Sequence, residues 1–352
     1  MVRGRGQPER GGFMKILVAG AAGQVGCRLV RQLLERNHEV RGTVLPDDPA
    51  LERLEGLDVE LAAGDLTDEA FVEGAVAGVD AVIHTANIVG PQFDNNMQID
   101  RLIARVSGKH ADRLERLVYT SSSGVFPNNG ETIACAYHPV DERHPKRPMG
   151  EYSLGKLIGE AFTKMAARET GLRFSIVRPS HVQSGAAILS RFTVGGVAGL
   201  LERGQNTPLG ELYMADGTEL WHDVLARAED ENQPCSVRDM EGRPWVYQPN
   251  DARDIAHMLV CAVEEPGAVD ESFNCGAPAP FSFPEAAAIL AEKSGVEPLE
   301  VRVPVRYQYD HDNTKGRSLI NFRPRGDLRT MIETALLVRD EGFIDYDWEG
   351  VS

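Results

Sequence analysis

Short apolar runs alternate with segments of helical periodicity along the first half of the chain. The apolar runs cover residues 15–19, 39–44, 59–66, 80–86 and 117–123. Apolar residues recur at helical spacing in residues 27–36, 68–77, 97–110 and 152–169. Runs this short, each followed by a helical pattern, are typical of parallel strands that are covered on both faces. The alternation therefore predicts an α/β fold built on a doubly wound parallel sheet.

The first apolar run leads directly into a glycine turn. Residues 15–19 (KILVA) are followed by GAAGQVG, in which Gly20, Gly23 and Gly26 have the spacing G-x-x-G-x-x-G. Each glycine stands where a side chain would obstruct the tight turn, the approach of a pyrophosphate, or the packing of helix on strand. The helix that follows would direct its first amides and its positive dipole end toward the phosphates. The pattern predicts a dinucleotide-binding loop.

The end of the second run bears on the choice between NAD and NADP. About 20 residues after the glycines, an acidic residue binds the 2′-hydroxyl of NAD, whereas an arginine binds the 2′-phosphate of NADP. Val44 and Leu45 hold these positions, so neither rule is met. Asp47 and Asp48 follow, and two carboxylates would repel a phosphate. This favours NAD, although NADP and a purely solvated role for both carboxylates stay open.

Candidate catalytic side chains follow the fifth run. Residues 121–123 are three serines at the carboxyl end of a predicted strand, where the ligand crevice of an open α/β sheet lies, although serines also serve as turn residues. Tyr152 and Lys156 are four residues apart and therefore share one face of a helix. An ammonium beside a buried phenol stabilises the phenolate, which makes Tyr152 a candidate general acid–base. His84 stands within an apolar run, and we expect a core residue there rather than a catalyst.

Composition narrows the partners and the compartment. The 352 residues carry a formal net charge of −16, so a nucleic acid or an anionic membrane would be repelled over most of the surface. The five cysteines form no C-x-x-C pair and predict neither a zinc site nor a disulfide framework, which fits the cytoplasm. No apolar run approaches the ~18 residues of a membrane span, and no signal-peptide pattern is present. Residues 1–13 are rich in glycine and arginine and are predicted to be disordered.

From residue 14 to about residue 340 the chain resembles the extended branch of the short-chain dehydrogenase/reductase superfamily, the NAD-dependent epimerase/dehydratase-like proteins. Besides the glycine turn and the Tyr/Lys pair, the resemblance rests on LVYTSSSGVF (117–126), PVDE (139–142) with Pro148, IVRP (176–179), RDIA (253–256), SFNCG (272–276), DNTK (312–315) and FRP (322–324). It implies a Rossmann-type domain and a smaller α/β substrate domain, together with a homodimer joined by a four-helix interface. The Rossmann domain would comprise residues 14–180, completed by about 250–276, the substrate domain 181–249 and 277–352, and the dimer helices 98–110 and 152–169.

The resemblance also implies roles for individual residues. Tyr152 would be the general acid–base, and Lys156 would hold the nicotinamide ribose and favour the phenolate. The hydroxyl of Ser122 would bind the reacting oxygen. The remaining cofactor contacts would be Gly20, Gly23, Gln24, Val25 and Gly26 at the pyrophosphate, Leu45, Asp65 and Leu66 at the adenosine, Ala86 and Asn96 at the middle, and Pro179 at the nicotinamide end. No metal is implied.

Two departures from the family pattern limit the choice of substrate. The UDP-sugar epimerases of the branch typically place an asparagine three residues after the strand's arginine, whereas here Arg178 leads to His181. The dehydratases carry an Asp-Glu pair after the catalytic serine or threonine, whereas this chain has Ser123-Gly124. A UDP-sugar substrate and a dehydratase mechanism are therefore disfavoured. Candidates for binding an anionic substrate group are Arg191, Arg203, His222 and Arg243.

Three activities stay open at this point. The first is an oxidoreductase or epimerase that acts with NAD on a sugar-like alcohol. The second is an NADP-dependent carbonyl reductase of the dihydroflavonol-reductase type, which residues 40–44 also resemble, although Leu45 replaces that group's phosphate-binding arginine. The third is a non-catalytic dinucleotide sensor, a class that typically lacks the pair Tyr152 and Lys156.

Overall fold

The computed structural model describes residues 12–127, 135–207 and 209–348, and a seven-stranded parallel sheet forms its base. The strands are β1 (Lys15–Ala19), β2 (Glu39–Val44), β3 (Val59–Ala63), β4 (Ala81–His84), β5 (Arg116–Thr120), β6 (Phe174–Pro179) and β13 (Glu271–Cys275). Their order is β13-β6-β5-β4-β1-β2-β3, so the direction of winding reverses between β1 and β4. A ligand crevice is expected at the carboxyl edge beside this switch point. The predicted doubly wound α/β fold is confirmed.

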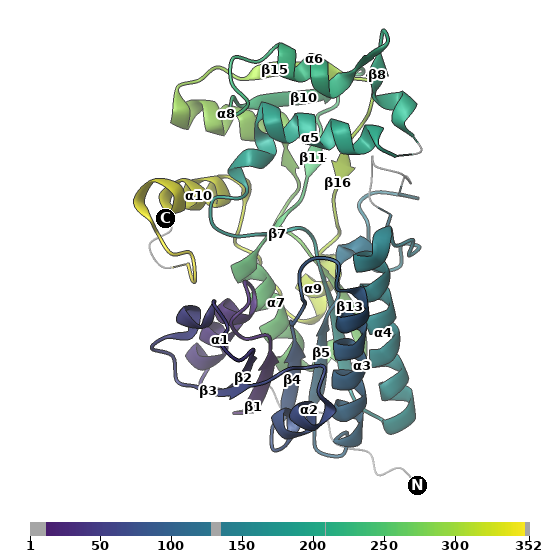
Figure 1. The fold of residues 1–352 in the computed structure, drawn as a ribbon, viewed down its shortest axis with the longest axis vertical. Helices are drawn as coiled ribbons and strands as arrows, with labels where there is room; N and C mark the ends of the chain where they lie inside the picture. The colour runs from purple at the N-terminus through teal and green to yellow at the C-terminus, as the bar shows by residue number, and fades with distance from the viewer. Residues whose placement is uncertain (1–11, 128–134, 208, 349–352) are drawn as a thin grey trace.

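Helices cover both faces of the sheet (Figure 1). One face carries α1 (Gly26–Glu35) and α7 (Ala252–Glu264), and the other carries α2 (Glu69–Val76), α3 (Phe93–Lys109) and α4 (Gly150–Thr170). Strand β1 shows why both faces are apolar. Ile16 and Val18 join the core under α1 and α7, whereas Leu17 and Ala19 join the core under α2 and α3. Alternate side chains of a central strand point to opposite faces, and here both are buried.

Element boundaries differ from the predicted ones by a few residues at the carboxyl edge. Strands β3 and β5 end at Ala63 and Thr120, three residues before the apolar runs end. Apolarity alone cannot mark a strand end here, because the chain stays partly buried as it turns away from the sheet. After β5, Ser122 caps a short 3-10 helix (Ser123–Val125). Residues 1–11, most of the predicted disordered tail, lie outside the described residues.

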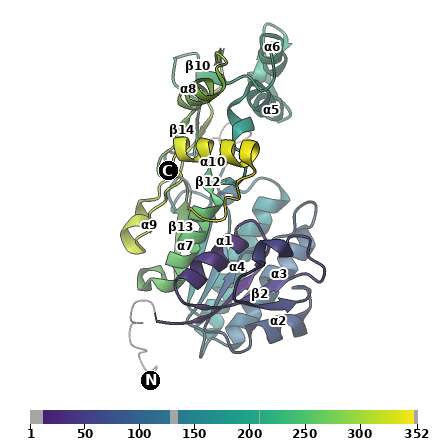
Figure 2. The same cartoon turned by 90° about the vertical axis from the view of Figure 1, so that its left-hand side faces the viewer.

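A second hydrophobic core lies beyond the carboxyl edge of the sheet (Figures 1 and 2). Trp245, Phe192 and Phe283 are fully buried at its centre. Its helices are α5 (Val194–Gln205), α6 (Leu220–Ala226), α8 (Phe283–Ser294) and α10 (Leu328–Glu341), and its paired strands are β10 (Cys235–Asp239) with β15 (Leu299–Val303), β11 (Val246–Tyr247) with β14 (Phe281–Ser282) and β16 (Gln308–Tyr309), and β8 (Met214–Ala215) with β9 (Thr218–Glu219).

Short elements connect the two cores. Strand β7 (Val182–Gln183) follows β6 directly and pairs with β12 (Asn250–Asp251), which leads into α7. The remaining described elements are the helix α9 (Thr314–Leu319) and 3-10 turns at Leu51–Leu54, Leu189–Phe192, Gly210–Tyr213 and Pro266–Ala268.

No helix within the described ranges is long and apolar enough to cross a bilayer.

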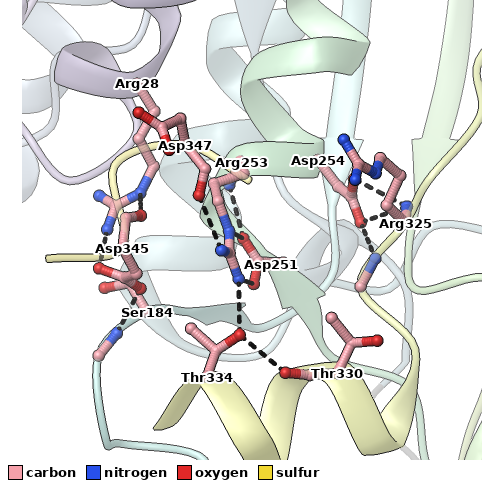
Figure 3. Close-up of polar contacts among 12 residues, drawn as sticks. Arg28, Ser184, Asp251, Arg253, Asp254, Arg325, Thr330, Thr334, Asp345 and Asp347 are labelled. Carbon is pink, nitrogen blue, oxygen red and sulfur yellow. Dashed lines mark hydrogen bonds and ion pairs between the residues drawn. The ribbon is translucent and has the colours of Figure 1, made fainter. Parts of the chain in front are cut away.

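The segment after α10 returns to contact α1 and α7 (Figure 3). Asp345 forms a 2.6 Å ion pair with Arg28 of α1. It also accepts a 2.8 Å hydrogen bond from the amide of Gly185, which follows β7. The main-chain carbonyl of Asp347 accepts from Arg253 of α7 at 2.9 Å. Arg28 and Arg253 are almost fully buried, so these contacts are shielded from solvent. The C-terminal segment therefore ties α1 and α7 to the connection between the two cores.

Candidate active site

A cleft of about 480 Å³ opens at the carboxyl edge of the sheet, where a ligand crevice is expected. Its walls come from the glycine turn, the ends of β2 to β6 and the first turns of α4. The predicted site residues that line it are Gly20, Gly23, Gln24, Val25, Gly26, Leu45, Asp65, Leu66, Ala86, Ser122, Tyr152, Lys156 and Pro179. The fold thus brings together residues that lie up to 159 positions apart, from Gly20 to Pro179.

The glycine turn forms a close-fitting cradle. Gly20 has φ +85°, and a Cβ built on it would lie 2.8 Å from the Cα of Ala86. A Cβ on Gly26 would lie 2.1 Å from the carbonyl oxygen of Gly20. No side chain caps the N-terminus of α1, whose cap residue is Val25. The first amides of a helix lack intrahelical acceptors, so this end is free to hold a diphosphate.

Arg28 holds the glycine turn in place through hydrogen bonds. Its Nη1 donates to the carbonyl of Gln24 at 2.6 Å, while its Nη2 pairs with Asp345. The side chain of Gln24 also donates to Ser184, on the connection to the second core. The C-terminal segment therefore restrains the glycine turn through one buried guanidinium.

Acidic and apolar groups surround the end of the cleft next to β2. Leu45 and Asp48 lie on the wall, whereas Asp47 does not. The Oδ1 of Asp48 accepts from the amide of Ala50 at 2.9 Å, which fixes this turn. Of the described residues that line the cleft, Lys156 is the only cation, and it belongs to the opposite end.

The candidate catalytic residues meet at that opposite end. Lys156 is 6% exposed, and its Nζ donates to the carbonyl of Thr120 at 3.2 Å. The same Nζ lies 5.9 Å from the centre of the Tyr152 ring. Tyr152 is 55% exposed, so the phenol is not buried as the sequence predicted, because it stands on the first turn of α4 at the cleft mouth. The Oγ of Ser122 accepts from the amide of Gly124 at 3.1 Å, which leaves its own proton free.

Two buried hydroxyls on the cleft wall have no hydrogen-bond partner among the described residues. The Oγ1 of Thr120 and the Oγ of Ser180 are buried and make no hydrogen bond, and both residues line the cleft. Buried polar groups are generally paired, so these two fit a site that a polar ligand fills.

A buried network that sequence reasoning missed supports Lys156. Asp100 of α3 accepts from Tyr119 Oη at 2.6 Å and pairs with His84 Nε2 at 2.8 Å. Burial alone would raise the pKa of Asp100, but His84 and the charge of Lys156 hold it below its usual value. The signal in the sequence was a carboxylate on the apolar face of the predicted helix, between Ile99 and Ile103. His84 is 2% exposed and paired, as expected for a core residue.

Asn96 is the one predicted cofactor contact that the cleft does not include. Its side chain accepts from the amide of Ile88 at 2.8 Å and donates to the carbonyl of the same residue at 2.9 Å. It lines a neighbouring cavity of about 430 Å³ behind residues 87–90, which Asp100 also lines. The structure thus places Asn96 as a support for the loop that forms the cleft wall.

A second buried pair fixes the serine-rich end of β5. Glu160 of α4 accepts from Arg178 Nε at 2.6 Å and from Ser121 Oγ at 2.9 Å. Burial opposes ionisation of Glu160, but pairing with Arg178 lowers its pKa to about 2. The carboxylate therefore stays ionised and holds β5, β6 and α4 together beside Ser122.

Residues 16–276 match the sequence model of the NAD dependent epimerase/dehydratase family. The chain belongs to this family. Sterol demethylase protein B of Methylococcus capsulatus is 32% identical over 176 residues, which cover 48% of this chain and 52% of that protein. Cinnamoyl-CoA reductase 1 of Petunia hybrida is 31% identical over 180 residues, covering 48% and 54%. The chain thus aligns with about half the length of these curated relatives.

Solved structures of epimerase/dehydratase type extend the likeness to the whole fold. A short-chain dehydrogenase/reductase superfamily protein from Agrobacterium tumefaciens, solved with bound NAD, has a TM-score of 0.75 at 26% identity and covers 93% of this chain and 98% of its own. UDP-glucose 4-epimerase from Thermotoga maritima, solved with UDP-glucose, has a TM-score of 0.67 at 17% identity, covering 94% and 100%. At that identity the second likeness shows the fold alone.

The four residues that the sequence suggested for binding an anionic substrate group have different surroundings in the structure. Arg243 pairs with Asp239 and Glu241, and His222 lies 3.3 Å from Glu219. Arg203 is exposed on α5. Arg191 is partly buried and lies against rings rather than carboxylates.

We predict that Gly159→Ala destabilises the protein. Gly159 lies on α4, one turn after Lys156, and a Cβ there would lie 2.0 Å from Tyr119 Oη and 2.4 Å from Asp100 Oδ2. Overpacking of this kind costs about 1–3 kcal/mol of unfolding free energy, measured by urea denaturation. Gly74→Ala on α2 is the matched control, since nothing lies within 4 Å of its Cβ, and it should be neutral or stabilising. Equal stability of the two variants would contradict the tight packing of this network.

Proposed function

We propose that the chain is an NAD-dependent oxidoreductase or epimerase that acts on a hydroxyl or carbonyl carbon of a sugar-like substrate. The observation that carries the proposal is that Ser122, Tyr152 and Lys156 line the same cleft as the glycine turn. Membership of the epimerase/dehydratase family supports the same reaction class. A purely sensing role would require neither the phenol nor the buried amine at the cleft mouth.

The cleft fits a dinucleotide along its length. Gly20 and Gly26 let the turn pack closely beside the uncapped start of α1, where the diphosphate would lie, and the unpartnered hydroxyls of Thr120 and Ser180 offer hydrogen bonds near the other end. Leu45, Asp65 and Leu66 would bind the adenosine, and Lys156 and Pro179 would bind the nicotinamide half. Asn96 would act through residues 87–90. The NAD in the Agrobacterium tumefaciens neighbour supports this assignment.

The chain's own residues divide the chemistry into three tasks. Bound NAD supplies the hydride acceptor. Tyr152 would take the proton of the substrate hydroxyl through its phenol oxygen, and the free proton of Ser122 would hold the same substrate oxygen. Lys156, whose Nζ lies 5.9 Å from the centre of the Tyr152 ring, would hold the nicotinamide ribose. Because Tyr152 is half exposed and lines the cleft, its phenol is accessible to a substrate that enters the cleft.

Reduction of a carbonyl with NADPH is the second candidate. The likeness to cinnamoyl-CoA reductase 1 of Petunia hybrida, at 31% identity, favours it. The end of the cleft beside Leu45 argues against this candidate. Among the described residues that line this end, Asp48 is acidic and none is a cation that could bind the 2′-phosphate of NADP.

We also propose a homodimer that forms through α3 and α4. Leu154 and Met165 are 42% and 45% exposed on α4, although both are large and apolar. Sedimentation velocity should give the mass of two chains for the wild type and of one chain for Leu154→Glu. Leu212→Glu, at a site that is 56% exposed near α5, should leave the mass unchanged. A monomeric wild type would contradict the dimer.

Tyr152→Phe should abolish turnover while leaving the affinity for NAD nearly unchanged. The phenol oxygen is the proposed proton acceptor, and general acid–base groups contribute roughly 100-fold or more to rate. Turnover would be followed by NADH absorbance and by product analysis on a panel of sugars and sugar acids. Tyr137→Phe removes a hydroxyl from an exposed tyrosine outside the cleft and serves as control. Full activity of Tyr152→Phe would remove the phenol from the mechanism.

Separate titrations should show tighter binding of NAD than of NADP. Asp48 faces the position of the extra phosphate, and like-charge repulsion at short range is worth about 1 kcal/mol or more, or roughly 5- to 10-fold in affinity. Asp48→Asn should narrow the difference, whereas Asp47→Asn, which lies off the cleft wall, should not. Tighter binding of NADP by the wild type would favour the carbonyl reductase instead.

A further inference from the structure

Arg191 has no counterion among the described residues, although the protein carries a net charge of −16. Its guanidinium carbon lies 4.4 Å from the centre of the Tyr247 ring, and its Nη2 lies 3.3 Å from His181 Nδ1. No carboxylate of the described residues lies within ion-pair distance of it. The buried side chains of Arg28, Arg178 and Arg253 each pair with a carboxylate, whereas buried Arg116 donates to two main-chain carbonyls.

His181 presents a neutral ring to this cation. Its Nδ1 lies at hydrogen-bond distance from two groups, the Nη2 of Arg191 and the hydroxyl of Tyr247, the latter at 3.1 Å. A guanidinium only donates, so Nδ1 accepts and the ring proton lies on Nε2. Burial and the nearby basic groups, Arg191 first among them, lower the pKa of His181 to about 3, so it is uncharged at neutral pH. Burial likewise lowers the pKa of His311 to about 4, so the charged groups that act on His181 at neutral pH are Arg191 and Arg203.

The pair lies beside the catalytic end of the cleft. Ser180 and Val182, the chain neighbours of His181, both line the cleft. The ring of Tyr309 stacks on His181 with 4.7 Å between centroids, and its hydroxyl lies 2.5 Å from the Oγ of Ser123. Ser123 in turn follows Ser122, which lines the cleft. The pair is thus linked to the catalytic end of the cleft through the cleft wall, although Arg191 and His181 are not themselves among the residues that line it.

The chemistry of the pair selects a single carboxylate. A guanidinium donates a fork of N–H groups that matches a carboxylate, and the Nε2–H of His181 adds one neutral donor. The pair itself carries one positive charge, which one carboxylate neutralises. The fully buried ring of Tyr247 packs against the guanidinium and holds it in place.

We propose that Arg191 and His181 bind a carboxylate of the substrate, which makes that substrate a hydroxy acid such as a sugar acid. The proposal rests on the proposed function, because it places the reacting hydroxyl of the same molecule at Tyr152. It also gives a role to His181 at the position where the UDP-sugar epimerases have asparagine.

Binding to the NAD-loaded protein tests the proposal without requiring turnover. Calorimetry would compare glucuronate with glucose, galacturonate with galactose, and UDP-glucose with UDP. The wild type should bind at least one acid more tightly than its neutral partner, and Arg191→Met should reduce that affinity roughly 10- to 100-fold. Arg191→Lys should recover part of the loss. Arg243→Met, whose arginine already pairs with Asp239 and Glu241, is the matched control and should behave as the wild type.

Three outcomes would overturn the carboxylate site. They are equal binding of acid and neutral partner by the wild type, unchanged acid binding by Arg191→Met with NAD affinity intact, and tight UDP-glucose binding that depends on Arg191. Tyr152→Phe separates this inference from the proposed function. If that variant keeps both acid binding and turnover, the acid–base assignment fails and the carboxylate site stands; if it loses turnover alone, both stand.

Discussion

The charge of Lys156, held out of water at the end of the cleft, is the constraint on which the rest of the structure depends. An ammonium that is 6% exposed needs local compensation, since desolvating an unpaired ion costs several kcal/mol. The carbonyl of Thr120 and the charge of Asp100 provide it. Those groups come from β5 and α3, and Asp100 is itself held by Tyr119 and His84 from β5 and β4. Two strands and two helices must therefore meet in one register before the amine is placed beside Tyr152.

A second set of buried ion pairs performs the same task at the glycine turn. Arg28 links the carbonyl of Gln24 to Asp345 of the C-terminal segment, and Asp345 also holds the amide of Gly185 (Figure 3). Removing one partner of a buried pair typically costs about 3–5 kcal/mol. The geometry of the glycine turn thus depends on a residue more than 300 positions away along the chain. The segment after α10 therefore supports the turn that we propose as the diphosphate site.

Sequence reasoning predicted the parts of the molecule that local patterns encode. Apolar runs, glycine spacing and helical periodicity gave the sheet, the turn and the face shared by Tyr152 and Lys156. What failed was information carried only by distant contacts. Asp100 was not identified from the sequence, because its partners Tyr119 and His84 lie on other elements, and the hydrogen bonds of Asn96 to Ile88 were not foreseen. Among the candidate anion-binding residues, Arg191 differs from Arg243 solely through its neighbours in space, which no spacing along the chain reveals.

The most direct test of the account is a crystal structure of the protein with NAD and a substrate acid bound. The account predicts a nicotinamide ring beside Lys156 and a substrate oxygen at hydrogen-bond distance, about 2.6–3.2 Å, from the phenol oxygen of Tyr152. A dinucleotide whose nicotinamide lies away from Tyr152, or a substrate oxygen that contacts neither Tyr152 nor Ser122, would contradict it.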